Sequence, residues 1–470
     1  MRILIAGAGI GGLALAHALR RGGADVAIYE RDPSPRTRDQ GYRLHIDPNG
    51  NAALRACLPT AILDLAHRTS GASGDRVAFY TQDLIELSAQ VFPSIPPAEI
   101  TNVDRATFRR ALLTDLNVTF GHTVTGYDIT PSGRVRVALS ATAAGAAGDT
   151  PTAAAAAATS SPAATSSPAA TATAVSNAAA TATATSSAAA TASVSAAATA
   201  GVANTAADNN AGVADTAADH TAGAADIAAS ASSLSAGGSL SGDGSFFDEG
   251  DLLVGADGVG SAVRRQLAPS ATLRDLGLRC IYGRMPLAAA DLPPDFDRGF
   301  AWVSGANGYG AGFAPVRFRT PTGVPDYLMT TLVAPTAVLG ELDRPSEALR
   351  QICLDASATW HPAVRHLFAA ADPTSFFPIV LRAGTRLTPW SPGPVTLLGD
   401  AIHTMPPAGG VGANTALQDA ALLAAELLSG KPLLEAVAAY ESVMLPRGFD
   451  TIDSSVRMIG QMVPPPSARP

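Results

Sequence analysis

Residues 2–30 decide the fold. Arg2-Ile-Leu-Ile-Ala6 is a short apolar run that breaks into Gly7-Ala-Gly9-Ile-Gly-Gly12, and the residues that follow carry apolar side chains at helical spacing. Val26-Ala-Ile-Tyr29 is a second short apolar run, and it ends at Glu30. Strand, glycine turn, helix, strand and acid, in this order, form the βαβ fingerprint of dinucleotide-binding domains. We therefore expect an α/β protein that begins with a Rossmann-like unit.

Each glycine of the turn has a task in binding a dinucleotide. Gly7 permits the tight turn, Gly9 has no side chain to hold a pyrophosphate off the backbone, and Gly12 lets helix and strand pack closely. Glu30, about 20 residues on, can accept hydrogen bonds from an adenosine ribose and disfavours a 2′-phosphate. We predict NAD or FAD at this turn, held also by Arg31; the alternative is an ordinary glycine-rich turn.

Composition narrows the class of protein. The chain has 470 residues, enough for a large core or two domains, and its net charge of −8 argues against nucleic acid as a partner. The three cysteines form no CxxC pair and no metal-ligand spacing, so we expect buried reduced thiols, no metal site and a cytoplasmic protein. No apolar run is long enough to span a bilayer, and the N-terminal run is interpreted as a strand rather than a signal peptide.

One long segment interrupts the pattern of strands and helices. Residues 141–245 consist almost entirely of Ala, Thr, Ser, Gly, Val and scattered Asp. Such a composition cannot bury enough apolar area to offset its ordering entropy, so we predict a low-complexity, disordered insertion. Because strand-like runs flank it, the insertion is expected at a hairpin tip; a glycosylated stalk would require secretion.

The order of the elements predicts a domain arrangement. Alternating strands from residue 276 onward favour an antiparallel sheet, and two long helical patterns follow near the C-terminus. The expected parts are the first part of a nucleotide-binding domain with early strands of the sheet domain (1–140), the insertion (141–245), the second part (246–275), a substrate-binding sheet (276–385), the third part with C-terminal helices (386–463) and a tail (464–470).

Two arginines stand out before any comparison with known families. Arg43 and His45 share one side of a predicted strand at 41–46, where they either lie near a cofactor or face solvent. Arg105 follows Asp104, a plausible N-cap, and so lies in the first turn of a predicted helix. A cation is unfavourable at that end of the helix dipole, which indicates an anionic partner such as phosphate; a solvated surface arginine is the alternative.

Three motifs together resemble the flavoprotein aromatic hydroxylases, single-component FAD monooxygenases of the para-hydroxybenzoate hydroxylase type. They are the glycine turn with Glu30, the run Gly255-Ala-Asp257-Gly258-Val-Gly-Ser261-Ala-Val-Arg264, and the run from Gly399-Asp400 through His403, Pro406 and Gly410-Val-Gly412-Ala413-Asn414. The resemblance covers the nucleotide-binding half, and Val411 departs from it because many members have glutamine there. It implies a Rossmann-like FAD domain combined with an antiparallel substrate sheet and C-terminal helices.

The resemblance also implies roles for particular residues. Asp257 and Gly258 would lie along the pyrophosphate, Arg105 would contact that pyrophosphate, and Asp400 would hold the ribityl chain. The set Gly410, Gly412, Ala413 and Asn414 would lie beside the flavin ring. From the residues alone, glycines permit close approach of the backbone, and a helix N-terminus favours the negative charge of reduced flavin. Asp400 taken alone would be equally consistent with a turn or cap residue.

The chemistry implied by the resemblance is the hydroxylation or epoxidation of an apolar, aromatic small molecule. NAD(P)H would reduce the flavin, and O₂ would add to it to form a C4a-hydroperoxide that attacks the substrate. His403, Pro406 and Arg43 are the candidate catalytic residues, with a purely structural histidine as the alternative for His403. Pro406 and Pro407 would form a rigid wall poor in N–H donors. We expect no membrane association, and a monomer or homodimer.

Two other functions remain open at this stage. A flavin-dependent halogenase needs a lysine between flavin and substrate, and the sequence has only Lys431, beyond the last motif. A non-catalytic carrier on the same scaffold would lack flavin. The substrate itself is not specified, nor is Baeyer–Villiger oxidation excluded. Six aromatic residues of the sheet domain are expected either to line an apolar pocket or to form plain core: Phe300, Trp302, Tyr309, Phe313, Phe318 and Tyr327.

Overall fold

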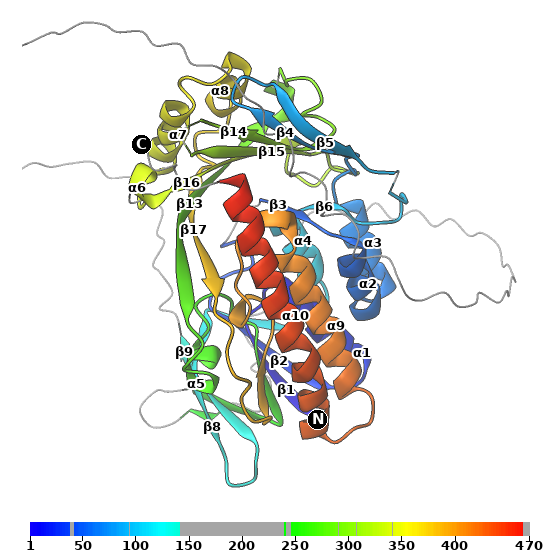
Figure 1. Ribbon diagram of the computed structural model, residues 1–470. Helices are drawn as coiled ribbons and strands as arrows, with labels where there is room; N and C mark the ends of the chain where they lie inside the picture. The colour runs from blue at the N-terminus through cyan, green and yellow to red at the C-terminus, as the bar shows by residue number, and fades with distance from the viewer. Residues whose placement is uncertain are drawn as a thin grey trace, which may run out of the picture. The chain divides into compact units, whose positions relative to one another are not determined.

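A parallel five-stranded sheet forms the nucleotide-binding part of the chain (Figure 1). Its strands are Arg2–Ala6 (β1), Asp25–Glu30 (β2), Val118–Phe120 (β7), Leu252–Gly255 (β12) and Val395–Leu397 (β18). They lie in the order β18-β12-β1-β2-β7, and every neighbouring pair is parallel. Ile3, Leu4 and Ile5 of β1 are fully buried, as expected for a central strand covered on both faces. The predicted Rossmann-like unit is confirmed.

The computed structural model describes residues 1–37, 42–93, 95–141, 246–289, 291–306, 308–340 and 342–463, and the backbone of 239–240. Except for Ala141 and the backbone of 239–240, the predicted insertion lies outside the described residues, as do Gly41 and the predicted tail. Every described element belongs to one unit of the chain.

Helices cover this sheet and connect its strands. They are Ile10–Arg21 (α1), Pro48–Cys57 (α2), Thr60–Arg68 (α3), Arg105–Leu113 (α4), Ala262–Leu267 (α5), Gly412–Leu427 (α9) and Leu433–Met462 (α10). Side-chain caps set several of their starts: Asp104 Oδ1 accepts from Thr107 N (2.9 Å), as predicted, and Ser261 Oγ accepts from Arg264 N (2.9 Å). In Figure 1, α9 and α10 lie side by side, and α9 also contacts α1 and α2. No described helix has the combined length and apolarity that crossing a bilayer requires.

The second large sheet has seven strands. These are Arg76–Thr81 (β4), Glu86–Val91 (β5), Leu273–Pro286 (β13), Gly299–Ser304 (β14), Gly310–Val316 (β15), Tyr327–Pro335 (β16) and Phe377–Gly384 (β17). They lie in the order β17-β13-β16-β15-β14-β4-β5. The predicted antiparallel sheet is confirmed for most pairs, but β14 and β4 pair in parallel. Thus residues 76–91, early in the chain, complete a sheet whose other strands come much later.

The two faces of the seven-stranded sheet bury different partners. One face packs against Ser346–Ala356 (α7) and Pro362–Ala369 (α8), close to Thr336–Leu339 (α6). The other face packs against Ala408 and the C-terminal end of α10, through Ile459 and Val463. Figure 1 shows α7 and α8 above the sheet and the end of α10 below it. The second face therefore lies toward the nucleotide-binding part.

Two smaller sheets complete the fold. Arg43–His45 (β3) pairs antiparallel with Asn102–Asp104 (β6). His122–Ile129 (β8), Val135–Ala141 (β9), Ser239–Leu240 (β10) and Phe246–Gly250 (β11) form a four-stranded sheet in the order β10-β11-β9-β8. Short 3-10 helices lie at Leu287–Ala289, Gly399–Ala401 and Ala408–Gly410.

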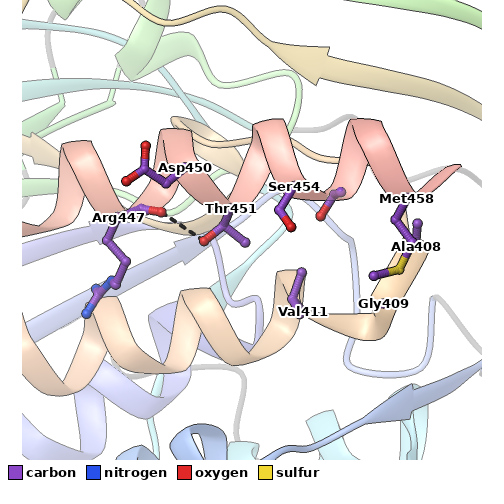
Figure 2. Close-up of a pocket in the computed structure, with 9 residues that line it drawn as sticks. Ala408, Gly409, Val411, Arg447, Asp450, Thr451, Ser454 and Met458 are labelled. Atoms are coloured by element: carbon purple, nitrogen blue, oxygen red, sulfur yellow. Dashed lines mark hydrogen bonds between the residues drawn. The ribbon is translucent and has the colours of Figure 1, made fainter. Parts of the chain in front are cut away.

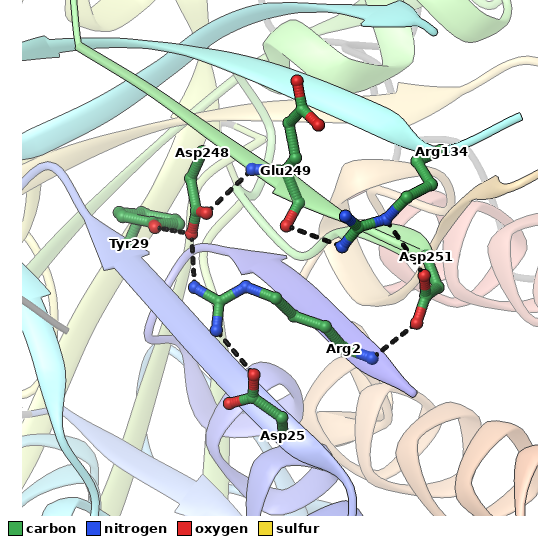
Figure 3. A network of polar contacts seen from close by, with 7 residues as sticks. All are labelled: Arg2, Asp25, Tyr29, Arg134, Asp248, Glu249 and Asp251. Atoms are coloured by element: carbon green, nitrogen blue, oxygen red, sulfur yellow. Dashed lines mark hydrogen bonds and ion pairs between the residues drawn. The ribbon is translucent and has the colours of Figure 1, made fainter. Parts of the chain in front are cut away.

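A polar network fastens the strands on either side of the insertion. β9 and β11 pair antiparallel, as a hairpin requires. Figure 3 shows Asp248 of β11 accepting hydrogen bonds from Tyr29 Oη and from Arg2 (2.8 Å), while the Arg2 backbone N donates to Asp251 (2.7 Å). Arg134, at the start of the hairpin, bonds Asp251 (3.2 Å). The base of the hairpin that carries the insertion is therefore tied to β1 and β2.

Candidate functional site

The glycine turn after β1 combines tight packing with open space. A Cβ on Gly7 would lie 2.4 Å from Ala256 O, and a Cβ on Gly12 would lie 2.4 Å from Gly7 O. Gly7 also has a φ of +103°, which favours glycine. At Gly9 the nearest atom to such a Cβ is 4.0 Å away, so the turn is open there. Helix α1 starts at this point with no side-chain cap and no acid in its first turn, leaving N–H groups for an anion.

Glu30 is held by the protein at the end of β2. Its carboxylate is 7% exposed and accepts from the backbone N of Ala8 (2.8 Å) and of Asp32 (3.0 Å). Arg109 pairs with it at 3.2 Å. Arg31 follows on the exposed side. The acid thus supports the glycine turn directly, and its contact with a ribose stays a prediction.

Helix α4 presents two arginines to this region. The guanidinium of Arg105 lies 5.6 Å from the centre of the Tyr42 ring, and no hydrogen bond or ion pair joins it to another described residue. Arg109 is buried, with Nε donating to Ala8 O (2.9 Å) and Nη1 3.3 Å from Asp32. Arg109 was not among the site residues expected from the sequence, although its position four residues after Arg105 places both on one face of the helix.

Asp257 and Gly258 lie next to the turn. Asp257 Oδ2 accepts from Ala262 N (2.7 Å) and so caps α5, while Oδ1 is buried and has no partner among the described residues. A Cβ on Gly7 would lie 2.9 Å from Asp257 Cα, which shows how close the two motifs are. Gly258 has a φ of +75° and open space around its Cα. The unsatisfied Oδ1 leaves an acceptor for a ligand or water.

Asp400 follows β18 in the short 3-10 helix Gly399–Ala401. Its side chain is exposed, and its carboxylate makes no hydrogen bond with any described residue. Surrounding protein raises the pKa of Asp400, and the charges of His403 and Arg105 oppose that rise. Both cations therefore lie near this carboxylate.

His403 belongs to a buried ionic cluster. It is 1% exposed, its Nε2 bonds Asp419, and its ring packs against Gly448 of α10. Burial lowers the pKa of His403, but Asp419 outweighs this effect and the net pKa is raised. Nδ1 is buried without a partner in the described chain. These contacts place His403 in the scaffold beside Asp400, and a catalytic role for it stays a prediction.

The glycine loop leads into α9. Gly409 and Gly410 have φ values of +75° and +65°, and α9 begins at Gly412 with no side-chain cap and no acid in its first turn. Ala413 is half-buried in that turn. Pro406 is buried and Pro407 exposed, so the predicted proline wall would present Pro407 to solvent. The open helix N-terminus matches the expectation for a flavin site.

Asn414 ties the glycine loop to β3. Its Nδ2 donates to the carbonyls of His45 and Gly410 (3.0 Å each), and its Oδ1 accepts from Asp47 N (3.0 Å). All of these partners are protein atoms, so Asn414 shapes the loop. A direct contact between Asn414 and a cofactor stays a prediction.

Arg43 lies on β3, directly opposite Asp104. It bonds the Asn102 side chain, and its buried Nε has no partner among the described residues. Burial lowers the pKa of Arg43 to about 10, an effect that Tyr327 partly opposes. Tyr327 donates to Asp104 Oδ2 (3.0 Å), so this cluster joins β3 and β6 to the seven-stranded sheet. Arg43 therefore faces the predicted substrate sheet.

The three motifs meet in space. A Cβ on Gly11 would lie 2.8 Å from Leu398 Cδ1 and 3.1 Å from Ala416 O, and a Cβ on Gly399 would lie 3.1 Å from Ala416 Cβ. The first turns of α1 and α9 and the turn that carries Asp400 are therefore neighbours. A cavity of about 580 Å³ borders the glycine loop on its α10 side (Figure 2). Its lining includes Gly409, Val411, Arg447, Thr451 and Met458.

The six aromatic residues divide between the two faces of the sheet. Trp302 and Tyr327, with Phe300 and Phe318 partly buried beside them, share the face that packs against Ala408. Phe313 and Tyr309 pack on the opposite face with α7 and α8, so these two follow the alternative expectation, plain core. Side chains alternate along a strand, and spacing alone does not tell which face is which. Tyr42 reaches the face that packs against Ala408, and its ring centre lies 5.4 Å from that of Tyr282.

These features fit an FAD molecule. The turn is open at Gly9, two neighbouring helices lack side-chain caps, and neither the Arg105 guanidinium nor the Asp400 carboxylate makes an ion pair or hydrogen bond with a described residue. A pyrophosphate needs N–H donors and a cation, and a ribityl chain needs an acceptor for its hydroxyls. The residues present supply each of these.

Comparisons with known proteins agree with this arrangement. Residues 341–454 match a family model described as an FAD binding domain, and residues 5–53 match one described as an NAD(P)-binding Rossmann-like domain. A dual O-methyltransferase/FAD-dependent monooxygenase of Cercospora beticola is 24% identical over 98% of this chain and 46% of its own length. A 6-hydroxynicotinate 3-monooxygenase of Bordetella bronchiseptica is 33% identical over 38% of this chain and 45% of its own length. The chain thus spans about half the length of these curated relatives, or less.

A solved structure matches nearly the whole fold. A putative FAD containing monooxygenase from Photorhabdus luminescens is 25% identical, covers 98% of each chain and superposes with a TM-score of 0.67. The resemblance drawn from the three motifs, the α/β fold class and the choice of FAD are confirmed by these matches.

Proposed function

We propose that this chain is an FAD-dependent monooxygenase of the aromatic hydroxylase type, an oxidoreductase that uses NAD(P)H and O₂ to oxygenate an apolar, aromatic small molecule. The observation that carries the proposal is the unpaired Asp400 carboxylate beside two uncapped helix N-termini. The hydroxylase named among the relatives acts on an aromatic ring, which supports the substrate class.

Each residue of the site has a proposed task. FAD, when bound, supplies the redox and oxygen chemistry, and the chain supplies orientation and charge. Arg105 and the N-terminus of α1 would neutralise the pyrophosphate, and Asp400 would accept hydrogen bonds from the ribityl hydroxyls. The N-terminus of α9 would favour negative charge on the flavin ring. Pro406, buried and without an N–H, would help exclude proton donors on that side.

The substrate would lie on the sheet face that packs against Ala408. Trp302 and Tyr327 supply apolar surface there, and Arg43 supplies a cation next to Tyr327. We propose hydroxylation or epoxidation as the reaction. The three free, buried cysteines support a cytoplasmic location, which fractionation of the native host would test.

The first test is the absorbance spectrum of the purified protein. Purified protein should carry a flavin spectrum, or regain one with added FAD, and a panel of phenols, quinolones and hydroxypyridines should include a compound that stimulates NAD(P)H oxidation. Incorporation of ¹⁸O from ¹⁸O₂ into that compound would establish a monooxygenase. Folded protein that stays colourless with FAD would support a carrier. In the same assay, Pro406→Gly should release more H₂O₂ per NAD(P)H while FAD stays bound; an unchanged H₂O₂ yield would remove the shielding role.

A halogenase is not supported by the position of the chain's lysine. Lys431 lies in the exposed connection between α9 and α10, where its ammonium pairs with Glu426 (2.5 Å). It is remote in the fold from the sheet face described above. Halide-dependent product in the substrate panel would revive that alternative.

A further inference from the structure

One buried carboxylate accepts hydrogen bonds from three donors next to the turn that carries Asp400. Asp419 of α9 is fully buried, and it accepts from the backbone N of Gly399 (2.9 Å), from His403 Nε2 and from Arg447 of α10 (2.8 Å). A buried carboxylate is costly unless opposite charge and hydrogen bonds compensate it. Here a backbone donor, an imidazole and a guanidinium do so together.

Two of these donors flank Asp400. Gly399 comes directly before it and His403 three residues after it, and His403 N donates back to Gly399 O (3.0 Å). Thr404 Oγ1 also donates to Asp400 O (2.7 Å). Gly399 has a φ of +59°, a left-handed conformation that glycine adopts readily and that lets the chain turn sharply before Asp400. Asp419 therefore forms hydrogen bonds at both ends of the turn from Gly399 to His403, and Asp400 is the exposed residue of this turn.

We propose that Asp419 is a positioning residue that keeps the Asp400 carboxylate aimed at the ribityl chain of FAD, with Arg447 as its counter-charge from α10. The inference rests on the proposed role of Asp400 and extends it from the residue that touches FAD to the residues that orient it. Rigid support from behind is what a binding group needs in order to hold its geometry. Arg447 also lines the cavity of Figure 2, so this support is reached from the α10 side of the glycine loop.

A double-mutant cycle on FAD affinity tests the proposal. Apoprotein is titrated with FAD, and binding is followed by quenching of flavin fluorescence, in the wild type, Asp419→Asn, Asp400→Ala and the double variant. If Asp419 acts through Asp400, Asp419→Asn raises the Kd about tenfold in the wild-type background but less than about twofold in the Asp400→Ala background. Equal factors in both backgrounds would overturn the proposal and leave Asp419 a general stabiliser.

A matched control separates positioning from folding. Glu441 of α10 is also a buried carboxylate, but it accepts from Trp390 Nε1 (3.0 Å) and Thr396 Oγ1 (2.7 Å), away from the turn. Glu441→Gln should lower thermal stability and leave the Kd for FAD within about twofold. A Kd change as large as that of Asp419→Asn would show that any buried carboxylate here matters equally, against the proposal.

A second variant covers the case in which Asp419→Asn does not fold. Arg447 is partly exposed, so Arg447→Met should fold, weaken FAD several-fold and lose that effect in the Asp400→Ala background. Arg386→Met, which removes the exposed pairs with Asp450 and Asp453, is its control and should leave the Kd unchanged. Unchanged affinity in Arg447→Met would overturn the role of Arg447. If Asp400→Ala alone binds FAD normally, the assignment of Asp400 itself fails, which is a separate and distinguishable result.

Discussion

The guanidinium of Arg109 lies 3.2 Å from the Glu30 carboxylate, and both side chains are almost completely buried. Arg109 also pairs with Asp32 (3.3 Å) and donates to Ala8 O (2.9 Å). One arginine of α4 thus joins the end of β2 to the glycine turn after β1. The acid of the dinucleotide fingerprint is oriented by the protein before any nucleotide binds.

Arg109→Met should destabilise the apoprotein by about 3–5 kcal/mol, because it leaves two buried carboxylates without their cation. Urea unfolding followed by circular dichroism measures this change. Arg110→Met is the control: Arg110 is exposed and donates a hydrogen bond to Thr107 Oγ1 (3.0 Å), so its loss should cost less than about 0.5 kcal/mol. Similar costs for the two variants would show that the buried pairs contribute little.

Asp400→Ala should weaken FAD binding by about 2–4 kcal/mol, since the ribityl hydroxyls lose a charged acceptor. The Kd from equilibrium titration of the apoprotein gives the answer. Asp128→Ala removes an exposed carboxylate on β8 and should bind FAD like the wild type. Equal affinities of the Asp400 variant and the wild type would sink the assignment.

Arg105→Ala should weaken FAD binding most at low ionic strength, because salt screens the attraction between a guanidinium and a pyrophosphate. The gap between variant and wild type should narrow as NaCl rises from about 0.05 to 0.5 M, over which the Debye length shrinks several-fold. A gap that does not depend on salt would instead indicate that Arg105 acts through its contact with Tyr42.

Deleting residues 145–242 removes the two-residue edge strand β10 but should leave the rest of the fold and the FAD site intact. The paired stretches Val135–Leu139 of β9 and Phe246–Gly250 of β11 remain, and their contacts with β1 and β2 through Asp248 and Asp251 do not involve the deleted residues. Thermal unfolding and the flavin spectrum of the shortened chain check this. Loss of bound FAD would show that the segment contributes to the site.

The His403–Asp419 pair should make stability depend on pH. The pKa of His403 is raised above its ordinary 6.5, so its contribution is complete below pH 6.5 and is lost as pH rises through the folded-state value. The pKa of Asp419 is lowered below 3.8 despite burial, chiefly by His403, so its contribution is present above pH 3.8 and is lost on strong acidification. Both contributions are complete between about pH 4 and 6.5.

His403→Gln should therefore cost about 1.5–3 kcal/mol in that window, and the cost should shrink toward pH 9. Urea denaturation of the apoprotein at several pH values measures it. His122→Gln is the control, since the His122 ring bonds the Phe120 carbonyl (2.9 Å) and no carboxylate. A cost for His403→Gln that stays constant from pH 5 to pH 9 would contradict an ionic pair.

Local chemistry made much of this protein readable from its sequence. Gly7, Gly9 and Gly12 act within one turn, Asp104 caps the helix that begins at the next residue, and Ser261 caps the helix at Ala262–Leu267. Such features depend on neighbours a few residues apart, whose geometry is set by the backbone. The motifs also predicted FAD as the cofactor, because the residues expected to bind it lie in short segments of the sequence.

Tertiary structure alone decided which residues, distant in the sequence, contact those segments. Arg109 of α4 reaches Glu30, Asp419 reaches back to Gly399 and His403, and β4 pairs with β14 across nearly half the chain. The alternation of side chains along β15 predicts which residues share one face of the strand with Phe313. Only the packing of α7 and α8 decides that this face lies on the side of the sheet opposite Ala408. The sequence determines which side chains share a surface of one element, whereas the burial of that surface against distant elements depends on packing of the whole chain.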